Sequence, residues 1–494
     1  MVPPRLALRA IVLSLVAAGC TPKVVKGNEP AEGSVTPTPP AAASPEGNVT
    51  VRYRFDVKPD RLRAEVCFDR GVAERLVPPM SRAIPFLVGA THHGRDLEVE
   101  DGELSLATLQ PGDCLEYAVD VEALLRRRST WDGVGRVGDD LLLSPDWWLW
   151  VPEPRGSGTS IRARFDGGME ASMPWPRSGG AYPFTIPEST FTWKAQGAFG
   201  RFEHRALTLR DAELSVTTVG DGFGERTGAV NAWLDRSAHA VADLLGGFPV
   251  SQAQVLLVAD PDRHRSFGYA LRGGGPSTAL LLPSRPSQPL LDEDWTAAHE
   301  LLHFSLPPLP TSDAWLYEGL TTYLTAVARA RAGIISEDEG WWELLDGFER
   351  GSRVGTGVSL RKESEQMHDN RTYWRVYWSG AALMLQIDVE LREQGMTLAE
   401  IVSRFAAQRP GDDHDWNAAE VVAQLSKLCG SEMPAEVVAR HLDAKDFPDT
   451  TALRAALGVQ LEAARAGKRA GKTVRYDDTA PNAAIRKAIM RRVR

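Results

Sequence analysis

The residues best placed to do chemistry in this sequence lie in a short run, HELLH, at residues 299–303. In a helix, positions i and i+4 lie one above the other on the same face, so His299 and His303 would project side by side. Two imidazoles in that arrangement can bind one Zn²⁺ ion at about 2.0–2.1 Å each. Glu300, beside them, would reach a water bound to that ion without being a ligand itself. The run therefore predicts a metal site with an acid–base group next to it.

A third ligand is expected from the segment that follows. Prolines at 307, 308 and 310 end the first helix, and residues 311–313 (TSD) offer N-caps for a second helix over 314–331. On that second helix, with 14 residues between it and His303, stands Glu318. Two histidines and one glutamate leave the fourth coordination position open for water, as in catalytic zinc sites. The alternative is a solvated helix carboxylate, against which the apolar residues at 315–317 and 320 argue.

The elements before this region are expected to be strands. Apolar residues alternate along 51–57, 62–68 and 115–121, which is the pattern of half-buried strands. Strand-like runs continue to about residue 200, so residues 49–200 are predicted to form an N-terminal antiparallel β-sandwich. Cys67 and Cys114 face away from the apolar side of their strands. They are either a disulfide across a strand pair or two unrelated thiols.

The periodicity changes after residue 200. Residues 231–245 predict a helix, whereas 254–259 and 279–282 predict short buried strands. From Asp292 onward helices dominate, and the three acids at 292–294 suit a helix N-terminus. A capping box at 397–400 and Pro434 mark the first turns of two later helices. Residues 336–466 are predicted to be α-helical, and the basic stretch 467–494 a loosely held tail.

The first residues have the pattern of an export signal. Two arginines precede a short apolar run that ends in Ala17-Ala18-Gly19-Cys20. This ending resembles a bacterial lipobox, in which the cysteine is lipidated after cleavage, so residues 1–20 are predicted to be a lipoprotein signal peptide anchored through Cys20. A plain signal peptide is the alternative. Residues 21–48 are rich in Pro, Ala, Thr and Ser and predict a disordered linker. The expected location is the bacterial cell envelope, as an outer-membrane lipoprotein.

Composition excludes several classes of protein. The chain has 494 residues, of which 43% are hydrophobic and 24% charged, close to the averages for globular proteins. Its net charge of −9 gives no electrostatic reason to expect a nucleic-acid partner. Four cysteines are too few for a disulfide scaffold.

HELLH followed by WLYEG (315–319) resembles the gluzincin metallopeptidases. RVYWSGAAL (375–383) resembles the "VYxKG" segment of their aminopeptidases, and LQIDVELR (385–392) looks like the glycyl aminopeptidase family. The resemblance implies an α+β multidomain fold: a thermolysin-like α/β zinc peptidase domain over 201–335, then an α-helical domain. It implies that His299, His303 and Glu318 bind one Zn²⁺ per chain, that Glu300 is the general base and that Tyr377 donates to the oxyanion. Without it, Tyr377 would be taken as a core tyrosine.

A glycine-rich segment precedes the helices. Gly273, Gly274 and Gly275 are the predicted substrate-binding residues, and residues 273–282 are expected to pair with an extended peptide as an edge strand. In relatives, a Glu in the corresponding segment holds the free amino group of the substrate. Residues 272–277 contain no Glu, so endopeptidase and aminopeptidase action both remain open.

The sequence therefore predicts a zinc-dependent peptidase that acts on peptides or proteins, with no nucleic-acid partner and with membrane contact through its N-terminal lipid. The alternative function is a non-catalytic cell-surface binding lipoprotein that retains its zinc site. The missing Glu favours this alternative, whereas HELLH, Glu318 and Tyr377 oppose it.

Overall fold

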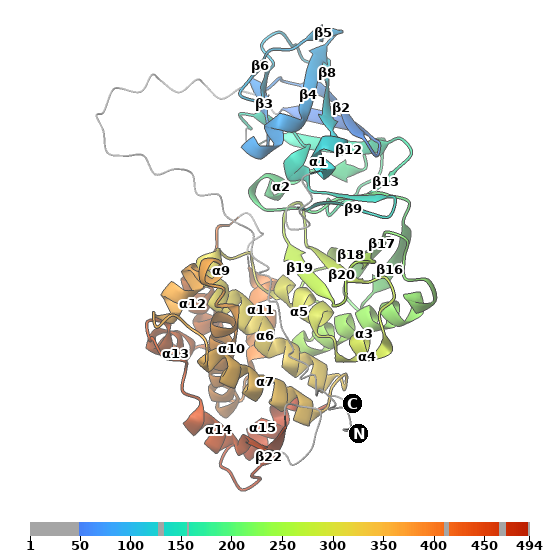
Figure 1. Ribbon diagram of the computed structural model, residues 1–494. Coiled ribbons are helices and arrows are strands. Elements are labelled where there is room, and N and C mark those ends of the chain that lie inside the picture. The colour runs from blue at the N-terminus through green and yellow to red at the C-terminus, as the bar shows by residue number, and fades with distance from the viewer. Residues whose placement is uncertain (1–48, 127–132, 156–157, 410–413, 464–470, 493–494) are drawn as a thin grey trace, which may run out of the picture.

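The computed structural model describes residues 49–126, 133–155, 158–409, 414–463 and 471–492. The predicted signal peptide, Cys20 and the linker 21–48 lie outside these residues. Three parts follow one another along the chain: a β-rich part, a mixed sheet with helices below it, and a helical part (Figure 1). Within the described residues, no helix combines the length and apolar character needed to cross a membrane.

The N-terminal part is built on a seven-stranded sheet in the order β14–β12–β1–β2–β8–β4–β5. Buried and more exposed residues alternate along β1 and through most of β2, as the period-two pattern predicts. One pair differs from the prediction, because β12 runs parallel to β1 and the sheet is mixed rather than antiparallel. Alternation of side chains is the same in both kinds of pair, so the sequence pattern could not reveal it. The strands are β1 (Thr50–Val57), β2 (Arg61–Arg70), β4 (Leu87–His92), β5 (Arg95–Asp96), β8 (Cys114–Asp120), β12 (Ser160–Asp166) and β14 (Phe184–Thr185).

Two four-stranded sheets complete this part, in the orders β13–β15–β10–β9 and β11–β3–β7–β6. Together the three sheets enclose one core that is rich in aromatic side chains. Tyr53 and Tyr117 lie fully inside it and donate their hydroxyls to the carbonyls of Trp150 and Trp148 at 2.8 and 3.0 Å. The smaller strands are β3 (Arg75–Val77), β6 (Val99–Glu100), β7 (Glu103–Ser105), β9 (Val134–Val137), β10 (Asp140–Leu143), β11 (Val151–Glu153), β13 (Glu170–Ser172) and β15 (Ala198–Gly200).

A disulfide joins two strands of the large sheet. Cys67 on β2 and Cys114 on β8 are directly opposite partners in the antiparallel register, and their sulfur atoms are bonded. Of the two alternatives that the sequence left open, the structure has the cross-strand bond. Cys429, the remaining cysteine among the described residues, is buried and reduced.

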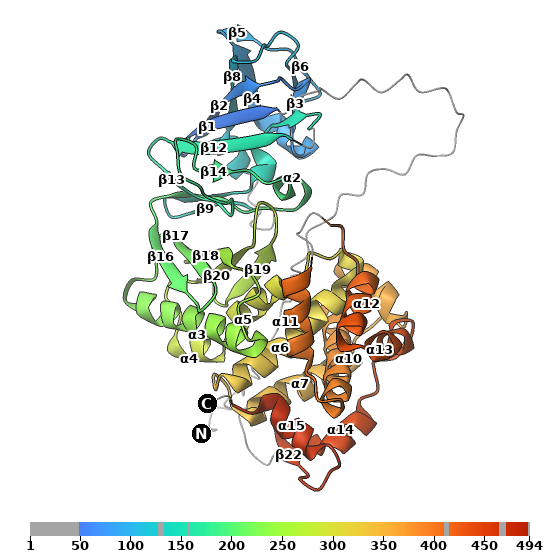
Figure 2. The ribbon, with the colours of Figure 1, turned by 180° about the vertical axis from the view of Figure 1, so that it is seen from behind.

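The middle part is a five-stranded sheet in the order β16–β17–β18–β20–β19. One face of β18 and β20 packs on the helices, and the other face packs on Leu142 and Ala198 of the N-terminal part. Burial on both faces explains the uninterrupted apolar runs 255–259 and 279–282 in these strands. Figure 2 shows the N-terminal part on one side of this sheet and α3 (Thr227–Leu245) on the other. The strands are β16 (Glu203–Thr208), β17 (Glu213–Val219), β18 (Gln252–Asp260), β19 (Phe267–Leu271) and β20 (Ser277–Pro283).

The helical part centres on the contact between α6 (Ala314–Arg331), whose bounds agree with the predicted helix, and α10 (Tyr373–Glu393). The two helices meet at Gly319 and Gly380: a Cβ on Gly380 would lie 1.8 Å from the carbonyl oxygen of Trp315. Only glycine allows this approach. The predicted capping box at the start of α11 is present. The neighbouring helices are α7 (Glu337–Ser352), α8 (Leu360–Glu365), α9 (Met367–Asn370), α11 (Leu398–Gln408), α12 (Ala418–Cys429), α13 (Met433–Leu442) and α14 (Thr451–Leu457).

The prediction of a loosely held tail is wrong for residues 471–492. Strand β22 (Lys472–Tyr476) pairs with β21 (Val459–Ala463), and α15 (Ala483–Met490) packs on the core through Ile489 and Met490. Arg486 is 1% exposed and donates to the carbonyl oxygen of Gly458 at 2.9 Å. The basic composition concealed these elements, because the few apolar residues are divided between strand β22 and one short helix.

Candidate metal centre and active site

The histidines lie on a short helix, α5 (Thr296–Leu302), and on the 3₁₀ turn that continues it. The predicted start of this helix at Asp292 is wrong, because residues 288–293 form a separate helix, α4 (Gln288–Glu293). The chain is extended at Asp294, whose carboxylate accepts from the backbone N–H of Thr296 at 2.8 Å. Asp294 thus satisfies a free donor at the start of α5, which is the usual role of a capping side chain.

The three predicted ligands lie together, and we call them the buried cluster: His299, His303 and Glu318. The Oε2 atom of Glu318 is 3.2 Å from His299 Nε2 and 3.5 Å from His303 Nε2. Their exposed fractions are 3%, 0% and 0%. The helical spacing of the histidines and the position of Glu318 on the first turns of α6 therefore give the convergence that the sequence predicted.

Burial and charge act in opposite directions on this cluster. Burial raises the pKa of Glu318, but the two imidazoles outweigh it and lower that pKa to about 2. Burial lowers the pKa of His299, but its contact with Glu318 reverses the effect and leaves that pKa raised. For His303 burial dominates and its pKa is lowered. Glu318 is therefore an ionised carboxylate at neutral pH, as a metal ligand must be.

The cluster fits a metal ion. Within the part of the chain that the structure describes, Glu318 Oε1 has no hydrogen-bond partner although it is fully buried. Buried polar atoms are almost always satisfied, so such an atom needs an explanation. Two imidazole nitrogens and one carboxylate oxygen are a donor set that Zn²⁺ accepts, with one position left for water.

Aromatic neighbours hold the imidazole rings in place. The ring of Tyr317 stacks on His303 with centroids 4.2 Å apart, and Trp295 meets His299 edge-on at 5.0 Å. On the far side of His299, Thr325 Oγ1 is 3.5 Å from Nδ1. The rotamers of both histidines are therefore restricted before any ion binds.

Strand β19 runs directly over Glu300. A Cβ on Gly268 would lie 2.5 Å from Glu300 Cγ, so glycine is required at this position. The strand is fixed to α5 at both ends. Before it, Ser266 donates to Asp294; after it, Arg272 donates to the carbonyl oxygen of His303 at 2.8 Å. Strand and helix thus form one wall of the site.

The predicted substrate-binding glycines form the turn between β19 and β20. The N–H of Gly273 donates to the carbonyl of Lys194 at 3.0 Å, and a Cβ on Gly275 would lie 2.4 Å from the carbonyl oxygen of Pro174. A Cβ on Gly274 would likewise lie 2.4 Å from Cδ1 of Trp175. The turn is therefore packed against the N-terminal part of the molecule.

The expectation that residues 273–282 form an edge strand is wrong. They contain β20, which lies between β18 and β19, whereas the edge of the sheet is β19 at Phe267–Leu271. Local periodicity cannot reveal which strand is outermost, because that order depends on pairing between distant segments.

Tyr377 is half-buried on the first turns of α10, three residues before Gly380. Its ring packs against the main core, with Tyr373 edge-on at 6.5 Å. The close contact of Gly380 with α6 brings this turn of α10 near Glu318, which precedes Gly319 on α6. The role of its hydroxyl stays a prediction.

A narrow crevice lies beside Tyr317, with an accessible volume of about 10 Å³, enough for roughly one water molecule. Its lining brings together Trp193 and Lys194 of the N-terminal part with Pro308 and Leu309, which follow α5. Its lining residues are Trp193, Lys194, Ala270, Leu271, Arg272, Pro308, Leu309 and Tyr317.

Sequence reasoning missed two residues that build this wall, Gly268 and Arg272. It expected Asp294 at a helix N-terminus, but for a helix that begins at residue 292. Arg272 carried a signal, because a charged residue between the apolar run FGYAL and three glycines has to find partners when it is buried. Gly268 could be recognised only once the strand and the helix were seen together.

Comparison with known proteins gives the class of fold. No family model and no curated protein matches the sequence. Among solved structures, an aminopeptidase N family protein from Idiomarina loihiensis has a TM-score of 0.64 at 15% identity, covering 85% of this chain and 82% of that one. Native yeast LTA4 hydrolase has a TM-score of 0.51 at 11% identity, covering 84% and 73%.

The chain thus shares its fold with the aminopeptidase N family protein and with yeast LTA4 hydrolase. The resemblance predicted from HELLH, WLYEG and RVYWSGAAL is confirmed at the level of the fold, and the molecule is α+β with a β-rich beginning and a helical end. At these identities the likeness concerns architecture, so the reaction has to be argued from this chain's own residues.

Proposed function

We propose that this protein is a zinc-dependent peptidase. The observation that carries the proposal is the buried cluster, whose carboxylate oxygen Glu318 Oε1 lacks a hydrogen-bond partner in the described chain. The fold shared with an aminopeptidase N family protein supports it. His299, His303 and Glu318 would hold one Zn²⁺ ion.

The chemistry divides between the ion and the chain. Zinc in such a site lowers the pKa of a bound water toward about 7 and polarises the carbonyl of the scissile bond. Glu300, only 2% exposed and next to His299, takes a proton from the attacking water and passes it to the leaving amine. Tyr377 donates its hydroxyl proton in a hydrogen bond to the developing oxyanion.

The proposed substrate is an extended peptide. Strand β19 lies at one edge of its sheet and passes over Glu300, so a peptide added beside it as a further strand would lie next to that carboxylate. Neither β19 nor the turn that follows it carries a carboxylate. If the protein recognises the free amino group of a substrate, the carboxylate that binds it must come from another element. The test therefore needs substrates with free and with blocked N-termini.

The decisive experiment compares Glu300→Gln with Glu293→Gln, an exposed glutamate at the end of α4. Hydrolysis of a peptide library, with free and acetylated N-termini, is measured beside zinc content by elemental analysis. We expect Glu300→Gln to keep its zinc and lose about 10²–10⁴-fold in kcat, because a positioned general base contributes that much. Glu293→Gln should retain wild-type rates. A zinc-loaded wild type that cleaves nothing would instead favour the non-catalytic binding protein.

We also propose that the chain is a lipoprotein of the bacterial cell envelope, attached through Cys20. The support is the sequence alone: an apolar run ending in Ala-Gly-Cys, followed by a linker of low hydrophobicity. In a bacterial host, labelled palmitate should enter the wild type and not Cys20→Ser. The variant should leave the membrane fraction; retention there without label would contradict lipid attachment.

A further inference from the structure

A second group of histidines lies at the far end of the N-terminal part. Strands β4 and β5 are joined by a two-residue turn, and both of its residues, His93 and Gly94, have positive φ, at 51° and 74°. Two-residue hairpin turns of this type require such angles, and Asn, Asp and His are the non-glycine residues that best tolerate them. The turn therefore fixes His93 beside His92, the last residue of β4.

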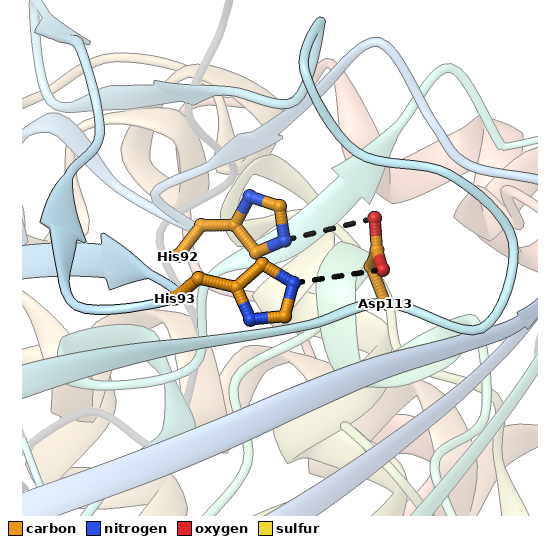
Figure 3. Close-up of side chains that lie close together, drawn as sticks. All are labelled: His92, His93 and Asp113. Carbon is orange, nitrogen blue, oxygen red and sulfur yellow. Dashed lines mark ion pairs between the residues drawn. The ribbon is translucent and has the colours of Figure 1, made fainter.

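The two rings face one carboxylate, as Figure 3 shows. Their centroids are 4.2 Å apart. His92 Nε2 is 3.6 Å from Asp113 Oδ2, and His93 Nε2 is 3.9 Å from Asp113 Oδ1. One donor atom from each residue lies within 4.8 Å of the others. We call these three residues the hairpin cluster.

The carboxylate of this cluster is held firmly. The carbonyl of Asp113 accepts from the N–H of Phe68 at 3.0 Å, and its Oδ2 accepts from the N–H of Gln110 at 2.8 Å. The next residue, Cys114, is bonded to Cys67. Asp113 is thus fixed on its backbone and side chain before any ligand arrives.

The spacing suits an ion between the groups better than direct bonds. Separations of 3.6 and 3.9 Å are too long for hydrogen bonds between these atoms. Two ligand atoms that each lie 2.0–2.1 Å from a tetrahedral ion are about 3.3 Å apart. A small approach of the two imidazoles and the carboxylate would therefore make room for such an ion between them. Among the described residues, His92 Nε2 is buried and without a hydrogen-bond partner.

We propose that His92, His93 and Asp113 bind a divalent transition-metal ion, of which Zn²⁺ is the probe of choice. Two imidazoles and a carboxylate suit zinc and copper and disfavour calcium and magnesium. His93 is 75% exposed at its side chain, so the remaining coordination positions face solvent. The bound ion ties the hairpin turn to the start of β8. The inference does not depend on the peptidase proposal.

The test is a zinc titration of the metal-stripped full chain by calorimetry, with metal content after gel filtration. The variant His93→Asn removes one imidazole and keeps the turn, because Asn-Gly is a preferred pair for it. His204→Asn is the control: His204 is also a surface histidine, with a single carboxylate partner, Glu170, at 3.1 Å. We expect the wild type and His204→Asn to bind one equivalent more than His93→Asn, or to bind it at least tenfold more tightly.

Three outcomes decide the inference. Equal stoichiometry and affinity in the wild type and His93→Asn would overturn it and leave His92 and Asp113 as an ion pair. Loss of the same equivalent in Asp113→Asn would support it independently. With Cu²⁺, nitrogen hyperfine structure should change from two coupled nitrogens to one in His93→Asn; an unchanged spectrum would overturn the assignment. The comparison stays valid if the buried cluster binds no metal, because the difference between variants is what is measured.

Discussion

The buried cluster and the hairpin cluster use the same three side-chain types in opposite surroundings. In the first, the proposed ligands come from α5, the 3₁₀ turn that continues it, and α6, and no side chain is more than 4% exposed. In the second, they come from a hairpin turn and a strand end, and the exposed side-chain fractions of His92, His93 and Asp113 are 13%, 75% and 27%. Two sets of the same ligand types thus differ in their exposure to water and in the secondary structure that positions them.

The difference teaches that position in the fold decides what such a cluster can do. An ion in the buried cluster would act beside Glu300 with almost no competing solvent, where electrostatic effects are strong. An ion in the hairpin cluster would be hydrated on one side, with no acid–base residue in the cluster itself, so it would hold two strands together. Chemistry is expected at one cluster and cross-linking at the other.

The largest expected effect comes from exchanging the carboxylate for an amide in each cluster. Glu318→Gln should abolish zinc binding at the buried cluster and peptide hydrolysis with it, because a direct ligand matters more than the outer partners whose loss costs about 10–100-fold. Asp113→Asn should remove the other ion and leave hydrolysis unchanged. Zinc content and kcat, measured on both variants, check this; hydrolysis lost in Asp113→Asn would break the comparison.

Tyr377→Phe should have the next largest effect. Removing one oxyanion donor typically costs about 10²–10³-fold in kcat. Zinc content at both clusters should stay at the wild-type value, because the phenol is not a ligand. Steady-state kinetics on a cleaved peptide measures the change, with Tyr373→Phe on the preceding turn as the control. An equal kcat in wild type and Tyr377→Phe would make Tyr377 a core residue.

Gly380→Ala tests whether the buried cluster depends on the contact between α6 and α10. Its Cβ would lie 1.8 Å from the carbonyl oxygen of Trp315, so the helices must move apart. We expect a loss of about 1–3 kcal/mol in the free energy of unfolding, as for other overpacked sites, and a lower kcat. The control is Gly228→Ala, whose Cβ would have no neighbour within 4 Å. Zinc at the hairpin cluster should not change.

The smallest effect concerns Asp294, the residue that caps the start of α5. Burial raises its pKa above 3.8, although Ser266, Thr296 and Arg329 oppose the shift. The folded chain therefore holds this proton more tightly than the unfolded chain, and wild-type stability falls as the pH rises from 3.8 through the raised pKa. Asp294→Asn has no carboxyl group to titrate and therefore loses this pH dependence.

Urea unfolding of the wild type and Asp294→Asn at several pH values measures the difference. As the pH rises from 3.8 through the raised pKa of Asp294, the free energy of unfolding should fall in the wild type relative to that of Asp294→Asn. Above that pKa, the difference between the two proteins should stay constant. If the stability of the variant relative to the wild type instead increased as the pH fell, the pKa of Asp294 would be lowered in the folded protein.

The sequence predicted the site better than the arrangement of the elements around it. The spacing of His299, His303 and Glu318 depends on helix geometry, which is local, so their convergence and the bounds of α6 could be predicted. The capping residue of α6 could not. Asp313 makes no cap there, and its carboxylate accepts instead from the N–H of Ala418, the first residue of α12, at 2.8 Å.

Long-range pairing accounts for the remaining errors. The parallel partner of β1 and the edge position of β19 depend on segments far away in the chain. The hairpin cluster was missed for the same reason, since His92 and His93 are adjacent and their carboxylate comes from another strand. No periodic pattern connects residues 93 and 113, and only the antiparallel register of β4 and β8 brings them together.

The attachment of β19 to α5 at both ends has a consequence for how a substrate enters. Ser266 with Asp294, and Arg272 with the carbonyl of His303, prevent the strand from swinging away from Glu300 without breaking buried hydrogen bonds. The separation between β19 and Glu300 is therefore fixed. A peptide that reaches the proposed base Glu300 would therefore have to enter alongside β19, because lifting the strand off α5 breaks those hydrogen bonds.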